Sequence, residues 1–312
     1  MKYHLKIPFK LNDNSSIKNK DENIPFKLDK YTIKINLKEN NQKGYFCIKY
    51  FEQKSEIWEF YQNFKKTIEY LNLSPLIWSI KVKPLDKENI SEYIFEEKPS
   101  LKNSDNNTFI CKTSEKILMN ESFKMGIVQL YPEENIIKEI SKNYEKLKHK
   151  NWDDNKKIIV AMDIYTNSYF KEKTTRFLSF INILELLKPE IKRKGLGLKC
   201  VNKLKSYVEQ YRTSDQVQYN ENLKNEFEGI FNSVKQLEKM SITYSIKQMP
   251  AQYKINIEKY DNMPKILSEC YNVRSKFAHE GEIIDTFDEC FNFLTEFIPI
   301  LIINAIENMD NK

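Results

Sequence analysis

The chain of 312 residues holds 50 Lys+Arg against 44 Asp+Glu, a net charge of +6, and 40% of its residues are hydrophobic. This composition is typical of a soluble globular protein with two domains, and it excludes disordered and fibrous classes. There are only six glycines and no G-x-x-x-x-G-K-[ST] or G-x-G-x-x-G motif. P-loop NTPases and dinucleotide enzymes are therefore poor candidates.

Short segments that alternate polar and apolar positions fill the first 130 residues, and this pattern predicts β-strands. Strands are expected at residues 4–9, 31–37, 44–51, 76–82 and 126–130. A polar turn joins the second and third of these, which indicates a hairpin. Residues 55–71 carry apolar side chains at helical spacing, and residues 98–107 have the composition of a loop. We expect a small mixed α+β domain over residues 1–130.

Helical periodicity dominates from residue 131 to the C-terminus. Pro132 followed by two glutamates is typical of a helix start, and residues 193–197 read as a tight loop. Helices are expected at residues 132–150, 156–170, 174–187, 198–211, 222–240, 264–278 and from about 285 onward. The sequence therefore predicts an α+β chain in which the α+β domain is followed by an all-helical bundle over residues 131–312.

No spacing of a metal site or of a disulfide framework is visible. The five cysteines are widely spaced without a C-x-x-C pair, and the three histidines form no H-E-x-x-H motif. We expect reduced thiols, no bound metal and no cofactor. The apolar run at 297–306 is shorter than a membrane span, and the first residues lack an apolar signal segment. A cytoplasmic location is expected.

Arg274 and His279 stand out because both residue types are scarce. Only four arginines occur among the 50 basic residues, and only three histidines occur in the chain. Arginine binds phosphate through a planar fork, and histidine exchanges a proton near neutral pH. Together they are sufficient for metal-free phosphodiester cleavage.

The five-residue spacing constrains this chemistry. In a regular helix, five positions separate two side chains by about 140° and ~7.5 Å of rise. The pair therefore works best if the helix ends near residue 278 and Gly281 lets the backbone turn, or if a second copy faces the first. A structural interpretation also stays open, in which both side chains cap or pair at a helix C-terminus.

Residues 274–279 resemble the R-x₄₋₆-H motif of HEPN domains, helical bundles that often act as RNA-cleaving toxins or defence nucleases. The wider pattern Tyr271-x-x-Arg274-Ser-x-x-x-His279-x-Gly281 resembles the signature of the ApeA-like HEPN group. Residues 176–187 resemble that group's second core helix, which carries an inward glutamate, here Glu185. The resemblance covers about residues 150–312 and departs from the group at Glu280, where glycine is common.

By that resemblance, Arg274 and His279 from two subunits would form one composite catalytic cleft in a HEPN-type bundle. Ser275 would occupy the polar position after the arginine, and Glu185 would orient Arg274 or His279. The supporting positions would be Tyr271 and Gly281. The residues alone leave open that Tyr271 packs in the core and that Glu185 pairs with Arg176 or Lys188.

The expected function is that of a metal-independent endoribonuclease, a prokaryotic toxin or antiphage defence effector that leaves a 2′,3′-cyclic phosphate. Expected partners are RNA, a second copy of the chain bound through the bundle, and a trigger or antitoxin protein. The alternatives are a non-catalytic HEPN module for dimerisation or binding, and a regulatory partner of another defence protein. Residues 1–150 hold 27 basic against 21 acidic residues, whereas residues 151–312 are neutral. The first domain is therefore the better candidate for capturing RNA electrostatically, or for sensing or restraint.

Overall fold

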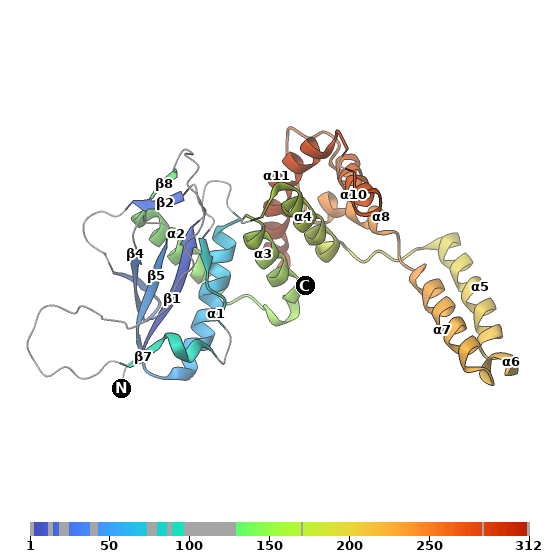
Figure 1. Cartoon of the computed structure of the whole chain (residues 1–312), viewed down its shortest axis with the longest axis horizontal. Helices are drawn as coiled ribbons and strands as arrows, with labels where there is room; N and C mark the ends of the chain where they lie inside the picture. The colour runs from blue at the N-terminus through green and yellow to red at the C-terminus, as the bar shows by residue number, and fades with distance from the viewer. Residues whose placement is uncertain are drawn as a thin grey trace, which may run out of the picture. The chain divides into compact units, whose positions relative to one another are not determined.

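The computed structural model describes residues 3–11, 15–18, 25–37, 43–73, 80–85, 89–96, 129–169, 171–282 and 284–310. The chain divides into two compact units, Met1–Asp154 with Thr166–Lys171 and Asn155–Tyr165 with Glu172–Lys312 (Figure 1). The first contains a sheet and the second is helical, so the chain is α+β, as expected. The expected loop at 98–107 lies outside the described residues, as do the first parts of the strands expected at 76–82 and 126–130.

An antiparallel six-stranded sheet forms the centre of the first unit, in the order β3-β4-β5-β1-β6 with β7 also paired to β1. Its strands are β1 (Tyr3–Leu11), β3 (Phe26–Leu28), β4 (Tyr31–Leu37), β5 (Lys43–Phe51), β6 (Ile80–Val82) and β7 (Ile94–Glu96). The predicted hairpin is confirmed, because β4 pairs antiparallel with β5. A separate parallel pair joins β2 (Ser15–Lys18) to β8 (Gln129–Pro132).

Close packing inside the sheet explains why Gly44 stands in β5. A Cβ at this position would lie 2.4 Å from the backbone oxygen of Asn36 on β4 and 2.9 Å from the Phe9 ring on β1. Both distances are shorter than van der Waals contact, so any larger residue would push neighbouring strands apart.

Two helices, α1 (Lys54–Leu71) and α2 (Glu133–Leu147), complete the core of the first unit. The Phe60 ring of α1 lies 5.7 Å from the Tyr144 ring of α2. The apolar face of α2 is buried in the same core through Ile136, Ile140 and Tyr144. These contacts place α2 in the first unit, so the division falls near residue 154 and not at the expected 130/131 boundary. The short 3₁₀ turn η2 (Asn89–Tyr93) belongs to the first unit, and η3 (Asp153–Asn155) contains the residue at which the division falls.

Packed helices form the core of the second unit. They are α3 (Lys156–Ser168), α4 (Lys173–Leu187), α8 (Ile242–Lys247), α9 (Met249–Gln252), α10 (Met263–Glu280) and α11 (Phe287–Glu307), followed by η4 (Asn308–Asp310). The last residues of α3 belong to the first unit. α4, α10 and α11 pack on one another through aromatic and aliphatic side chains, for example the rings of Phe177 on α4 and Phe287 on α11, 5.0 Å apart.

Among the described helices, α11 is the one long and apolar enough to span a bilayer by length and composition. Within the structure, 61% of this apolar stretch is buried. Its buried residues include Phe293, Phe297 and Leu301, which pack in the second unit. The helix therefore has the burial expected of a core helix in a globular unit.

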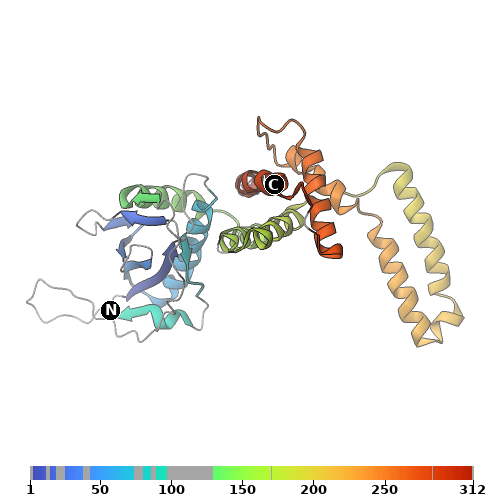
Figure 2. The ribbon, with the colours of Figure 1, turned by 45° about the horizontal axis from the view of Figure 1, so that its top comes forward.

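A helical hairpin, comprising α5 (Gly195–Arg212), α6 (Asp215–Gln218) and α7 (Glu221–Gln236), stands apart from this packing. Figure 2 shows α5 and α7 side by side, and the three helices pack mainly on one another. The expectation that every helix after residue 131 joins one bundle is corrected here. These three helices bury few apolar side chains: Val201 of α5 and Val217 of α6 are buried, and no residue of α7 is buried. This narrow apolar contact is the physical reason that the hairpin does not join the packed helices.

Candidate functional site

The motif singled out in the sequence lies on α10 from Tyr271 to His279, with Gly281 directly after the helix. The Asn262 side chain caps the start of this helix and Pro264 stands in its first turn, both of which favour helix initiation. At the other end Gly281 adopts φ +71°, the left-handed conformation that terminates helices. The helix is continuous through Glu280 and therefore ends two residues later than the end near residue 278 that would best suit the motif.

Glu185, Tyr271 and Arg274 come together between α4 and α10, and we call this group the Glu185 cluster. Oε1 of Glu185 lies 3.9 Å from Nη2 of Arg274. The Arg274 guanidinium lies 5.8 Å from the centre of the Tyr271 ring. Burial raises the pKa of Tyr271, and the negative charge of the nearby Glu185 carboxylate raises it further. The structure thus brings together three of the six residues singled out in the sequence.

Arg274 keeps hydrogen-bonding capacity within this cluster. The distance of 3.9 Å to Glu185 is short enough for an ion pair but too long for a hydrogen bond. A guanidinium has five N–H donors, and the side chain of Arg274 is 34% exposed. The carboxylate therefore attracts the guanidinium while leaving donors accessible to an anion from solvent.

Glu185 of α4 is the ion-pair partner of Arg274, and the buried residues of this helix are apolar apart from Ser179. Its side chain is 28% exposed, yet its Oε1 atom is buried and has no hydrogen-bond partner among the described residues. Lys188, one alternative ion-pair partner, instead donates from Nζ to the backbone oxygen of Glu185 at 2.7 Å. The Arg176 guanidinium lies over the rings of Phe180 and Phe291, 5.4 and 5.7 Å from their centres.

His279 lies outside the Glu185 cluster. It is exposed on the last turn of α10, and on this continuous helix it points about 140° away from Arg274. Ser275 is half-buried and, four positions before His279, shares its side of the helix. Within one chain, the motif is therefore divided between the Arg274 side and the His279 side of α10.

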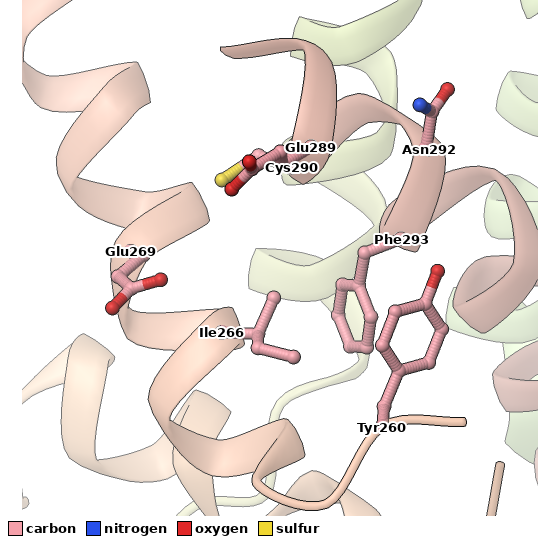
Figure 3. Close-up of a pocket in the computed structure, with 7 residues that line it drawn as sticks. All are labelled: Tyr260, Ile266, Glu269, Glu289, Cys290, Asn292 and Phe293. Carbon is pink, nitrogen blue, oxygen red and sulfur yellow. The ribbon is translucent and has the colours of Figure 1, made fainter. Parts of the chain in front are cut away.

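A hollow of about 330 Å³ lies between α10 and α11 and contains none of the predicted site residues. Figure 3 shows the rings of Tyr260 and Phe293 together at one end, with Glu269, Glu289 and Cys290 toward the other. Two carboxylates at this hollow disfavour an anionic ligand such as a phosphodiester. No three His, Cys, Asp or Glu side chains in the described part of the chain are grouped as metal ligands.

In the first unit, the basic run at residues 146–150 is partly engaged within the fold. Lys148 pairs with Glu145 at 2.7 Å and with Asp29 at 3.8 Å. Lys146 donates from Nζ to the hydroxyl oxygen of Tyr70 at 3.1 Å. These contacts direct two of the lysines toward neighbouring side chains, so the run is less available to RNA than its charge indicates.

Comparison with known proteins gives no match: no family model matches the chain, and no curated protein or solved structure does so.

Proposed function

We propose that the chain is a metal-independent endoribonuclease of the HEPN type, acting as a toxin or antiphage defence effector. The observation that supports this most is the contact between Glu185 of α4 and Arg274 of α10, which are 89 positions apart in the sequence. The resemblance assigns an orienting role to Glu185, and the geometry suits that role. A partly exposed arginine held by a carboxylate, without a hydrogen bond, is suited to receive a phosphate.

In the proposed reaction, the imidazole of His279 takes the proton from a ribose 2′-hydroxyl. The 2′-oxygen attacks the adjacent phosphorus, and the bond from phosphorus to the 5′-oxygen of the next nucleotide breaks. The leaving oxygen accepts a proton from the partner's His279. Arg274 offsets the charge that develops on the non-bridging phosphate oxygens. The products are a 2′,3′-cyclic phosphate and a 5′-hydroxyl.

A second copy of the chain is part of this proposal. Because His279 points about 140° away from Arg274 on the same helix, one chain does not present both groups to one phosphate. Two α10 helices facing each other would place the arginine of one copy near the histidine of the other. The proposed active species is therefore a homodimer.

The test is cleavage of ribosomal, transfer and messenger RNA by the purified full chain in EDTA. Wild type, Arg274→Ala and His279→Ala are compared with Lys276→Ala, a control that removes an exposed basic residue of the same helix. We expect cleavage by wild type and the control, loss of cleavage in the other two variants, and no cleavage of a 2′-O-methyl substrate. Wild type that is inert on every RNA, or variants that cut as well as wild type, would contradict the proposal.

A non-catalytic binding module is the second candidate, and the exposed position of His279 favours it. Two further acidic residues, Glu280 and Glu282, are exposed beside this histidine and weaken a site for RNA phosphate. In this case the Glu185 cluster would stabilise the packing of α4 on α10 without chemistry. Toxicity on expression in cells that persists in His279→Ala would support this function over the nuclease.

A further inference from the structure

The α5–α7 hairpin exposes more apolar area than its own packing uses. Six large apolar side chains on α5, on α7 and directly after α7 are 36–59% exposed, and we call this set the hairpin face. Its members are Leu204, Tyr207, Tyr211, Leu223, Ile230 and Leu237. With about 200 Å² for a fully exposed side chain of this size, these fractions add up to about 500 Å². This area lies in the upper range of the largest apolar patches on monomeric proteins, about 300–600 Å².

The seam between the two helices shows which way each helix is turned. Lys205 of α5 pairs with Glu238, which follows α7, at 2.5 Å. Arg212 of α5 pairs with Glu228 of α7 at 2.6 Å and lies 4.5 Å from the centre of the Phe231 ring. These residues mark the sides of the two helices that face each other.

The exposed residues on both helices share one side of the hairpin. On α5, Leu204 and Tyr211 come one position before the seam residues Lys205 and Arg212. On the α7 side of the hairpin, Ile230 and Leu237 come one position before Phe231 and Glu238, which also face the seam. One position corresponds to about 100° around a helix. Because the two helices are antiparallel, this rotation by one position places the exposed apolar residues of α5 and those of α7 on the same side of the hairpin.

Aromatic contacts connect the exposed apolar residues of α5 with those of α7. The Tyr211 ring of α5 is stacked on the Phe227 ring of α7 with centroids 6.3 Å apart. Along α5, the Tyr207 and Tyr211 rings are 5.1 Å apart, and their hydroxyl oxygens are 3.2 Å apart. These ring contacts extend the apolar surface from Tyr207 and Tyr211 of α5 onto α7.

Charge along the hairpin identifies the occupant. We call the end of the hairpin that joins the rest of the second unit its stem. The half nearest the stem, residues 191–205 and 233–240, holds eight basic residues and one acidic residue. The tip half, residues 206–232, holds two basic and five acidic residues. A second hairpin laid face to face in the opposite direction would place each acidic tip on a basic stem half, whereas a parallel arrangement would oppose like charges.

We propose that the hairpin is a self-association arm, in which the hairpin face packs antiparallel against the same face of a second copy. The product is an intermolecular four-helix bundle with twofold symmetry, in which the same patch is used by both copies. The apolar area of about 500 Å² per copy is most of the ~800 Å² that each partner buries in a standard interface, and the polar residues beside it supply the rest. The proposal depends on the hairpin's own residues and not on ribonuclease activity.

Sedimentation velocity of the full chain across a concentration series tests the proposal. We expect a dimer in the wild type, and weakening on the order of a hundredfold in Leu204→Ser/Tyr207→Ser. The matched control is Val160→Ser, which removes a similarly exposed apolar residue of α3, 47% exposed. It should leave the dissociation constant unchanged, and circular dichroism verifies that all three proteins remain helical.

Salt tests the orientation separately. The antiparallel arrangement brings opposite charges together, so the dimer should weaken as NaCl rises from 50 to 500 mM because salt screens that attraction. A dimer that tightens with salt would overturn the antiparallel arrangement. A monomeric wild type, or a dimer that survives Leu204→Ser/Tyr207→Ser unchanged, would overturn the arm itself, whether or not the chain cleaves RNA.

Discussion

The ion pair in the Glu185 cluster allows a quantitative prediction for Glu185→Gln, which keeps the shape of the side chain and removes its charge. At 3.9 Å from Arg274, two unit charges attract by about 1–4 kcal/mol for effective dielectric constants of 80 to 20. Both side chains are about a third exposed, so solvent screening and the cost of fixing them reduce the net value to about 0.5–1 kcal/mol. We expect Glu185→Gln to lower the free energy of unfolding by this amount.

The assay is a double-mutant cycle of Glu185→Gln and Arg274→Met, measured by urea unfolding with far-UV circular dichroism. The coupling energy should be about 0.5–1 kcal/mol in low salt and should fall in 1 M NaCl. All three tryptophans, at positions 58, 78 and 152, precede the second unit, so an unchanged fluorescence transition serves as the control. A coupling of zero, or one above 3 kcal/mol as in a fully buried pair, would refute the reasoning.

Three further predictions follow from other parts of the structure. Gly281→Ala should cost about 1–2 kcal/mol in urea unfolding, because a Cβ there meets no atom within 4 Å and only the left-handed backbone is strained; an unchanged midpoint would contradict this. Phe297→Ala, at a fully buried position, should cost about 3–5 kcal/mol, and a loss below 1 kcal/mol would show that the site is not packed. Burial raises the pKa of Tyr144, Tyr253 and Tyr271 above 10. The unfolded chain therefore loses these protons first, and stability should fall as pH rises above 10; a pH-independent unfolding midpoint between pH 9 and 11.5 would count against it.

Local elements were predictable where the periodicity of side chains and the turn chemistry agree. The hairpin of β4 and β5 follows from alternation on both sides of a polar turn, and α1 from apolar residues at helical spacing. The end of α10 shows the limit of such reasoning. Gly281 indicates a turn, but a left-handed glycine ends a helix at the residue directly before it, so the helix extends through Glu280 and carries His279 with it.

Partnerships between elements were not predictable from the same patterns. The apolar face of α2 predicts that this helix packs against another element. Its sequence does not show whether that element is the sheet of the first unit or the helices that follow. The apolar residues of α5 and α7 likewise predict amphipathic helices without showing that one face stays exposed. The contact of Glu185 with Arg274 had support only in the family resemblance, since no spacing rule links positions in different helices.

The hydrogen bonds at the stem of the hairpin bear on which insertions and deletions the chain can tolerate. The backbone N–H of Met240 donates to the carbonyl oxygen of Ile191 at 2.8 Å, and the N–H of Arg193 donates to the oxygen of Glu238 at 2.8 Å. The hairpin therefore leaves and rejoins the helical core at one point, like a cassette inserted between α4 and α8. Insertions with adjacent ends are the ones that folds tolerate best. Evolution or an engineer can thus lengthen, shorten or exchange this cassette while the contact of α4 with α10 stays in place.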